Sequence, residues 1–244
     1  MKIITWNCQM AFRKKAESIL RYKPDILIIP ECEHIGKIFL NPETLKPNDS
    51  LWFGKNLNKG LGIFSYGNYK LRLLEIHNPE IKTIVPIQVS GGEYDFILFA
   101  IWAFNNEDVN YNYIGQVWKA IHYYEDLLKT EKVIMIGDFN SNVIWDKLHR
   151  KSNHANVIEK LAELNIFSAY HHHLNQIPGE ENHPTFYLYR HRDKPYHIDY
   201  CFASKEFIDL IENVEIGIYD DWNKLSDHKP LQVTFQKAAA GNNR

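Results

Sequence analysis

Polar side chains stand at or just beyond the ends of five apolar segments, and their types are those of a hard-metal site. The set comprises Asn7, Glu31, Asp138 with Asn140, Asp199, and Asp227 with His228. Carboxylate and carboxamide oxygens with few nitrogens suit Mg²⁺ or Mn²⁺ and not zinc. Each side chain also has an ordinary structural reading as a turn former, a surface acid or a buried hydrogen-bond acceptor. Together, at strand ends, they predict a divalent-cation site.

The segment 133–142 carries the clearest signal among them. Four apolar residues, 133–136, are closed by Gly137, a pattern typical of a strand buried on both faces. Asp138 and Asn140 are two residues apart, so extended backbone directs both side chains to one face. Placing a carboxylate and a carboxamide there without partners costs free energy. The alternative is a strand-to-helix turn that one of them caps.

The N-terminal segments are expected to bring two of these side chains to one sheet edge. An apolar strand over 2–6 is followed by a helix over 12–22 and a second buried strand over 26–29. This strand–helix–strand spacing predicts two parallel neighbours. Because Asn7 and Glu31 follow the two strands, both should leave the same edge of the sheet.

The middle of the chain is rich in short strands joined by tight turns. Strands are predicted over 51–54, 60–66, 69–77, 81–90 and 94–102, and their short connections predict antiparallel hairpins. Further predicted segments are helices over 110–129, 155–164 and 205–211, a strand pair over 185–189 and 196–203, and strands over 214–218 and 230–235. The hairpins favour an α/β fold, a four-layer α/β sandwich of two packed mixed β-sheets flanked by helices. We expect one domain over 1–236 and a disordered tail over 237–244.

Composition narrows the class of protein. Of the 244 residues, 45% are hydrophobic and 14% aromatic, which suits a globular core. No apolar stretch approaches the ~20 residues of a membrane span, so no membrane insertion is expected. The N-terminus lacks a signal-peptide layout, and three cysteines predict reduced thiols in a cytoplasmic protein. A net charge of −2 argues against a protein that coats nucleic acid without specificity, but it is compatible with an enzyme that binds phosphate at one local site. The sequence leaves the oligomeric state open.

Several short motifs occur in one order along the chain. They are Trp6-Asn7, Glu31 closing the second strand, Gly137-Asp138-Phe139-Asn140, Ile198-Asp199-Tyr200, and Ser226-Asp227-His228-Lys229-Pro230-Leu231. Their order and spacing resemble the endonuclease/exonuclease/phosphatase superfamily. This superfamily includes DNase-I-like nucleases, exonuclease III, inositol polyphosphate 5-phosphatases and neutral sphingomyelinases. The resemblance extends from Lys2 to about Phe235 and implies a metal-dependent phosphoesterase.

The resemblance implies a metal set of three side chains. Asn7 and Glu31 are expected to hold a divalent cation, Mg²⁺ or Mn²⁺, with Glu31 as a direct ligand and Asp227 beside the metal. The chain departs from the family pattern nearby. Pro30 stands where many relatives have Gln, and Gln9 stands where nucleases similar to exonuclease III often carry an acid.

The resemblance also implies four catalytic side chains. Asp138 should align or activate the attacking water, and Asn140 should bond a phosphate oxygen. His228 should face the phosphate, with Asp199 hydrogen-bonded to its other ring nitrogen, a contact that fixes the tautomer and raises the imidazole pKa. Trp102 stands where relatives usually have a catalytic His or Tyr. Since Trp carries no proton, this departure argues against a two-histidine mechanism.

Three basic runs adjoin the predicted site strands. The candidates for contact with a phosphate backbone are Arg13, Lys14, Lys15, Arg150, Lys151, Arg190 and Arg192. They favour a nucleic acid as partner, with DNA preferred and endo- or exonuclease action open, and ordinary solvated charge is the alternative reading. The other candidate functions are a phosphatase or phosphodiesterase on a small phosphorylated molecule or lipid headgroup, and a catalytically inert binding scaffold. The intact polar set argues against the scaffold.

Three aromatic residues are candidates for a wall beside the metal: Trp102, Phe186 and Tyr196. In similar abasic-site endonucleases, aromatic residues at the latter two places line the pocket for an extruded sugar. The competing interpretation places all three in the core. Two other patterns are interpreted as structural: the histidines at 171–173 as a solvated loop, and the glycines at 60 and 62 as close backbone packing.

Overall fold

The computed structural model describes residues 1–38, 44–81, 83–105 and 112–237. Of the predicted tail over 237–244, only Lys237 belongs to these residues. The first two residues of the predicted helix over 110–129 also lie outside them. Within the described residues, no helix is long and apolar enough to cross a membrane.

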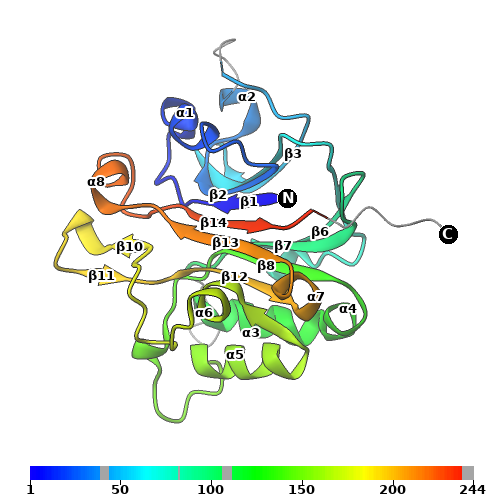
Figure 1. The fold of residues 1–244 in the computed structure, drawn as a ribbon, viewed down its shortest axis with the longest axis vertical. Helices are drawn as coiled ribbons and strands as arrows, with labels where there is room; N and C mark the ends of the chain where they lie inside the picture. Colours follow the sequence, from blue (N-terminus) through cyan, green and yellow to red (C-terminus); the bar gives the residue numbers. More distant parts are fainter. Residues whose placement is uncertain (39–43, 82, 106–111, 238–244) are drawn as a thin grey trace.

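Two mixed six-stranded sheets form the centre of the fold (Figure 1). The first sheet has the order β13-β14-β1-β2-β4-β3 and the second the order β5-β6-β7-β8-β12-β9. The strands of the first sheet are β1 Lys2–Thr5, β2 Ile26–Cys32, β3 Asp49–Asn56, β4 Lys59–Ser65, β13 Ile211–Ile216 and β14 Leu231–Phe235. Those of the second are β5 Lys70–Leu73, β6 Ile84–Ser90, β7 Phe96–Trp102, β8 Val133–Asp138, β9 Ile166–Ser168 and β12 Asp199–Ser204. A separate two-stranded ribbon pairs β10 Phe186–Tyr187 with β11 Pro195–Tyr196.

The predicted four-layer α/β sandwich is confirmed, with helices outside both sheets (Figure 1). The helices are α1 Ala16–Leu20, α2 Ile35–Ile38, α3 Ile114–Tyr123, α4 Glu125–Thr130, α5 His154–Glu163, α6 Ala169–Leu174, α7 Lys205–Ile208 and α8 Tyr219–Trp222. Helices α1 and α2 lie beyond the first sheet, and α3, α4 and α5 beyond the second. The pairs β1–β2 and β7–β8 are parallel, and the predicted hairpins β3–β4, β5–β6 and β6–β7 are antiparallel. The hairpin predicted between 60–66 and 69–77 is wrong, because the chain passes there from the first sheet, where β4 lies, to the second, where β5 lies.

Alternation of side chains along the strands creates three hydrophobic layers. The inner faces of the two sheets meet in the largest cluster, to which Ile28 of the first sheet and Ile134 of the second both belong. The outward-facing Met135 packs with α3 and α5, and the outward-facing Leu27 packs with α1. Burial on both faces explains why these strands read as continuous apolar runs.

Several predicted elements are shorter or divided in the structure. The helix predicted over 12–22 is a 3₁₀ turn, Phe12–Lys14, followed by α1, because Lys15 has a non-helical backbone and its ammonium donates to the Cys8 carbonyl oxygen. The helix predicted over 110–129 divides into α3 and α4 at Tyr124. Likewise the strand predicted over 196–203 divides into β11 and β12.

The interpretation of residues 171–173 as a solvated loop is wrong. The three histidines lie on α6, whose first turn is capped by the Ser168 side chain. The side chain of His171 is largely buried, whereas His172 is exposed. Sequence alone gave no sign of this helix, because three consecutive histidines show no helical periodicity.

Gly137 permits the close approach of two strands immediately before Asp138. Its φ of +149° is unfavourable for side-chain-bearing residues, and a Cβ atom there would lie 1.9 Å from the Ile101 carbonyl oxygen on β7. The position therefore accepts only glycine.

We expect Gly137→Ala to destabilise the protein by about 2 kcal/mol or more, because a methyl group would force β7 and β8 apart. Urea unfolding followed by circular dichroism measures the change. Gly36→Ala on α2 is the matched control, since its Cβ would come no closer than 3.4 Å to another atom. Equal stabilities for the two variants would contradict the expected close packing.

Candidate active site

Three buried titratable side chains meet at one end of the sandwich, where strands of the two sheets end side by side. Asp138 and Asp199 are register partners on the antiparallel strands β8 and β12 of the second sheet. His228 comes from the loop that precedes β14 of the first sheet. Its Nδ1 lies 2.9 Å from Asp199 Oδ2, and its Nε2 lies 4.0 Å from Asp138 Oδ2. These are three of the four side chains predicted to be catalytic.

Hydrogen bonds from backbone N–H groups to two side-chain hydroxyl groups fix the position of Asp199 and His228. The Thr185 hydroxyl oxygen accepts hydrogen bonds from the backbone N–H groups of Ile198 and Asp199, at 2.9 and 3.0 Å. The Ser226 hydroxyl oxygen accepts the backbone N–H of His228 at 3.0 Å. Neither hydroxyl was predicted as a site residue, although Thr185 begins a predicted strand and Ser226 begins the motif that carries Asp227 and His228.

Asn7 connects the two sheets at this edge. Its Nδ2 donates to Asp138 Oδ2 at 3.0 Å, from the end of β1 to the end of β8. Asn140 donates to the same oxygen at 3.1 Å and to the Ala103 carbonyl oxygen at 2.9 Å, and its backbone N–H donates to Asp138 Oδ1. Asn140 has a φ of +49°, which asparagine tolerates better than most residues. The predicted fourth catalytic residue therefore lies against the carboxylate of Asp138.

Burial and neighbouring charges both shift the pKa values of Asp138 and His228. Burial raises the pKa of Asp138, and the Asp199 carboxylate raises it further, against the opposing effect of His228. Burial lowers the pKa of His228, but the Asp199 and Asp138 carboxylates outweigh burial and raise it above its usual value. The site therefore favours a charged imidazole beside a carboxylate with a high affinity for a proton.

The same trio has the composition of a cation site. Among the described residues, Asp138, Asp199 and His228 form the one group of three whose ligand atoms lie within 4.8 Å of one another. Asp199 Oδ1 is buried and has no hydrogen-bond partner within the described part of the chain. An orphaned carboxylate oxygen beside a second buried carboxylate fits a divalent cation or its bound water.

The other two predicted metal residues lie in separate ion-pair and hydrogen-bond contacts. Glu31 Oε1 lies 3.2 Å from the Lys59 ammonium, although the hydrogen bond from Cys8 N to the Pro30 carbonyl oxygen aligns Glu31 with the end of β1 as predicted. Asp227 Oδ2 accepts a hydrogen bond from Gln9 Nε2 at 3.0 Å. A cation at Glu31 would replace the ammonium of Lys59 as its partner.

Gln9 is a site residue that sequence analysis treated only as a departure from the family pattern. Its side-chain amide donates to Asp227, and its carbonyl oxygen accepts from the Arg190 guanidinium. Its backbone N–H donates to Asn7 Oδ1 at 3.0 Å. Gln9 thus links the predicted metal residues Asn7 and Asp227 to a predicted phosphate-binding arginine.

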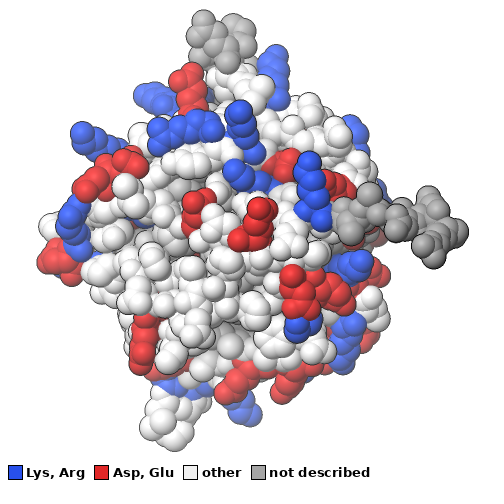
Figure 2. All heavy atoms as spheres, in the orientation of Figure 1, with Lys and Arg blue, Asp and Glu red and all other residues white. Residues whose placement is uncertain are grey.

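The predicted basic rim is partly neutralised by acidic partners. Arg13 pairs with Glu33 at 2.8 Å, and Arg192 pairs with Asp220. Arg190 instead contacts Gln9 and the Lys224 carbonyl oxygen. In the view of Figure 2, Lys and Arg side chains gather over the region of α1 and α2, with Asp and Glu side chains beside them. Arg190 is the arginine of the three that contacts the site without an acidic partner among the described residues.

The three aromatic candidates divide between two sides of the trio. The Phe186 ring lies 4.7 Å from the His228 ring and 6.4 Å from that of Tyr196, on the ribbon side. Trp102 is the register partner of Asp138 on β7, on the other side from Asp199, and its ring packs against Phe104 at 4.9 Å. A wall made of all three side chains remains a prediction, with Trp102 separated from the other two in strand order.

A cluster of histidines lies near Asp199. It contains the buried His154 and His197, the partly buried His171 and the exposed His183, together with Glu181. His171 Nε2 lies 3.1 Å from Glu181 Oε1, and His197 Nδ1 donates to the His183 carbonyl oxygen at 2.8 Å. Both ring nitrogens of His154 are buried and have no hydrogen-bond partner within the described ranges. Burial lowers the pKa of His154 to about 3 and that of His197 to about 4.

These low pKa values predict that the free energy of unfolding decreases as the pH falls. Between pH 6.5 and 4 the unfolded chain binds protons at both positions and the native state does not, so stability falls as pH falls through this window. Each histidine contributes about 1.4 kcal/mol per pH unit. His154→Leu should reduce the slope of unfolding free energy against pH by that amount, measured by urea unfolding from pH 7 to 4.5. The exposed His172→Leu is the control, and an unchanged slope in His154→Leu would contradict the assignment.

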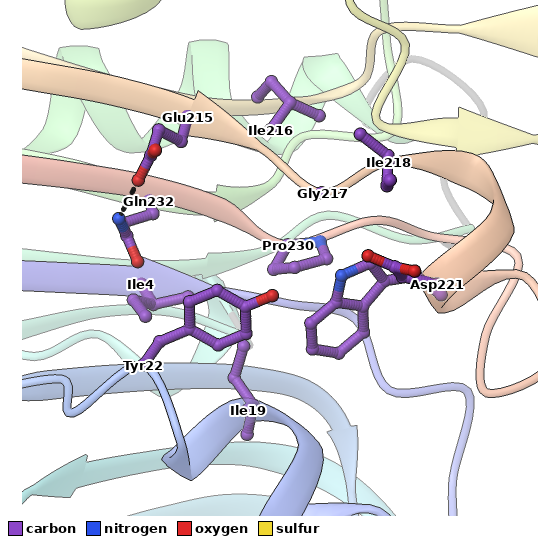
Figure 3. A pocket seen from close by; sticks show the side chains of 11 residues that line it. Ile4, Ile19, Tyr22, Glu215, Ile216, Gly217, Ile218, Asp221, Pro230 and Gln232 are labelled. Carbon is purple, nitrogen blue, oxygen red and sulfur yellow. Dashed lines mark hydrogen bonds between the residues drawn. The ribbon is translucent and has the colours of Figure 1, made fainter.

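A separate apolar cavity of about 210 Å³ lies on the outer side of the first sheet. Figure 3 shows Ile4, Ile19, Tyr22 and Pro230 around it, with a hydrogen bond from Gln232 to Glu215 at one side. The lining includes none of the predicted site residues. This cavity is therefore distinct from the trio.

Comparisons with known proteins place the fold. No protein-family model and no curated protein matches the sequence. Solved structures do match over nearly their whole length. They include a 3′ phosphatase, NExo, from Neisseria bound to product DNA hairpin, at 18% identity over 97% of this chain and 99% of that chain, with a TM-score of 0.67. An AP endonuclease from Archaeoglobus fulgidus is 19% identical over 96% and 99%, with a TM-score of 0.65.

A third match is the endonuclease domain of TRAS1, a telomere-specific non-LTR retrotransposon, at 16% identity. It covers 97% of this chain and 98% of that chain, with a TM-score of 0.64. At these identities the likeness establishes a shared arrangement of sheets and helices.

Proposed function

We propose that this chain, which has the DNase-I-like fold of the endonuclease/exonuclease/phosphatase superfamily, is a divalent-metal-dependent phosphodiester hydrolase. Its proposed activity is that of a nuclease acting on DNA. The observation that carries the proposal is the buried contact between Asp199 and His228 beside Asp138, at the edge where Asn7 joins the two sheets. A structural core gains nothing from three buried titratable groups at one point, because each costs desolvation free energy.

The proposed cofactor is Mg²⁺ or Mn²⁺. Asn7, Glu31 and Asp227 would hold it, and the orphaned oxygen of Asp199 and the carboxylate of Asp138 add negative charge at the same edge. When bound, such a cation neutralises charge on the phosphate and lowers the pKa of its water. The all-oxygen character of these side chains supports a hard cation.

The remaining roles belong to side chains of the protein. Asp199 accepts the Nδ1 proton of His228 and holds the ring so that Nε2 points toward Asp138. The charged imidazole is then a hydrogen-bond donor to a phosphate oxygen. Asp138, held by amides of Asn7 and Asn140, is the proposed acceptor for the proton of the attacking water. Asn140 would exchange its bond to Asp138 for one to the phosphate.

DNA is the proposed substrate because the solved structures of this fold named above include a 3′ phosphatase bound to product DNA hairpin, an AP endonuclease and a retrotransposon endonuclease domain. The ribbon β10–β11 and Arg190 border the trio on one side, which supports contact with an extended strand. Three buried free cysteines, Cys8, Cys32 and Cys201, support a reducing cytoplasmic setting.

The test is one substrate panel with Mg²⁺, Mn²⁺ or EDTA. It contains plasmid, single- and double-stranded oligonucleotides, an abasic duplex, a 3′-phosphorylated duplex, RNA, inositol phosphates and a lipid-headgroup phosphodiester. We expect DNA cleavage with either metal and none in EDTA. His228→Ala, purified in parallel, controls for contaminating nucleases.

Two outcomes would overturn the proposal. Full activity in EDTA after dialysis would exclude the metal-dependent mechanism. Hydrolysis of inositol phosphates or lipid headgroups without DNA cleavage would transfer the activity to the alternative substrate class.

Salt dependence tests whether Arg190 contacts the DNA backbone. Each phosphate contact releases counterions, so Arg190→Ala should reduce the slope of log affinity against log salt by about 1. Filter binding or anisotropy in EDTA measures the slope. Lys129→Ala is the matched control, because Lys129 lies on the outer helix α4 and pairs with Glu125 at 2.7 Å. An unchanged slope in Arg190→Ala would remove this residue from the interface.

A further inference from the structure

A cavity of about 440 Å³ opens on the Trp102 side of the trio. Three aromatic rings line it, those of Phe53, Trp102 and Phe104, together with the side chains of Lys55, Lys59 and His77. Phe53 and the two lysines belong to the β3–β4 hairpin, and Trp102 ends β7. Segments distant in sequence therefore build one aromatic hollow with two cationic side chains.

Two lining residues, Trp102 and Lys59, connect the cavity to the candidate active site. Trp102 is the register partner of Asp138 on the neighbouring strand. The Lys59 ammonium lies 5.4 Å from the centroid of the Trp102 ring and 3.2 Å from Glu31 Oε1. Lys59 thus lines the cavity and also contacts a predicted metal residue, so an occupant of the cavity would lie beside the proposed metal site.

The lining has the chemistry of a site for a flat aromatic ring. The rings of Trp102 and Phe104 are 4.9 Å apart and inclined by 41°. His77 Nδ1 is buried and has no hydrogen-bond partner in the described part of the chain. Burial lowers the pKa of His77, so its imidazole is neutral at pH 7 and offers one donor and one acceptor. Aromatic faces, a neutral hydrogen-bonding edge and two ammonium groups match a base attached to a phosphodiester.

We propose that this cavity binds one unpaired nucleobase of the substrate strand, next to the scissile phosphate. The inference rests on the proposed nuclease function and extends it to a specific substrate form. A base enters a cavity only after leaving its stack, which favours single strands, frayed ends or extruded nucleotides. Lys55 and Lys59 would then contact the flanking phosphates.

The experiment compares wild type with Phe104→Ala on labelled single-stranded DNA in Mg²⁺. A base-less tetrahydrofuran residue is placed in turn at each position around the cleaved bond. At one position, loss of the base should lower kcat/KM of the wild type by about 5- to 100-fold. Phe104→Ala should lose a similar factor on intact DNA and little more on the base-less strand, because both changes remove the same contact.

Two further variants and one further readout complete the test. Phe104→Leu keeps apolar volume if Phe104→Ala melts early, and Tyr123→Ala, an exposed aromatic on α3, controls for surface truncation. Binding of an oligonucleotide with 2-aminopurine at the sensitive position, in EDTA, should quench its fluorescence in the wild type and less in the Phe104 variants.

The outcomes separate this inference from the proposed function. DNA cleavage with independent, multiplicative losses, or with no sensitive position, overturns the base site and leaves the nuclease proposal standing. If no DNA is cleaved in the presence of metal, the proposed function fails and the base site with it. Phe104-dependent hydrolysis of a long-chain alkyl phosphodiester, with DNA untouched, assigns the cavity to an apolar chain.

Discussion

His228→Ala is expected to lower kcat by about 10²- to 10⁴-fold, and Asp199→Asn by a similar factor. The reason is the 2.9 Å contact between His228 Nδ1 and Asp199 Oδ2, which holds the imidazole in one tautomer and raises its pKa. Without the carboxylate, the ring keeps neither the orientation nor the proton. The two residues should therefore act as one unit, and the double variant should lose little more than either single variant.

Single-turnover cleavage of one oligonucleotide by the four proteins measures this coupling. His172→Ala on α6 controls for loss of a histidine from the surface. Melting temperatures show whether the buried substitutions alter folding. Independent losses that multiply in the double variant would refute the pairing of Asp199 with His228.

Asp138→Asn is expected to lower kcat by about 10²- to 10⁴-fold without rescue by excess Mg²⁺. The substitution keeps the volume of the side chain but replaces a proton acceptor with an amide. In the variant, the amides of Asn7 and Asn140 would face either an NH₂ group, which cannot accept their hydrogen bonds, or an uncharged amide oxygen in place of the carboxylate. The loss should appear in the chemical step and not in metal affinity.

Glu31→Gln is the matched comparison, because it removes one carboxylate charge from the same edge. We expect the Mg²⁺ concentration for half-maximal rate to rise by about 10- to 100-fold, with the rate restored by excess metal. Metal titrations of both variants separate the two roles. Rescue of Asp138→Asn by Mg²⁺ would contradict its role in the chemical step. Failure of Mg²⁺ to rescue Glu31→Gln would contradict the role of Glu31 in metal binding.

Much of the fold was predictable because its strands are buried on both faces. The runs 26–29 and 133–136 are apolar without interruption, and their partners in the sheets follow from short connections or a crossover. The breaks at Lys15 and Tyr124 were not predictable. Each depends on a tertiary contact, with the Cys8 carbonyl oxygen in one case and with the Asn78 backbone N–H in the other.

The candidate site follows the same division. Asp138 and Asp199 were identifiable because polar residues interrupt or end apolar strands, and His228 because it belongs to the motif that precedes the last strand. The contacts of Gln9 with Asp227 and of Glu31 with Lys59 were not, since they join distant or differently paired segments. A side chain's partner across 218 positions leaves no local pattern in the sequence.

The strand order of the first sheet has a consequence for synthesis of the protein on the ribosome. β14 lies between β13 and β1, so β1 waits for β14, the last described strand in chain order, before its antiparallel edge is paired. His228 and Asp227 precede β14 by a few residues, so they reach Asp138 only when that strand inserts. Pairing of such distant segments is slow and leaves an open strand edge in the nascent chain. A nascent chain that has not yet completed β14 is therefore expected to bind chaperones and to lack the proposed phosphodiesterase activity.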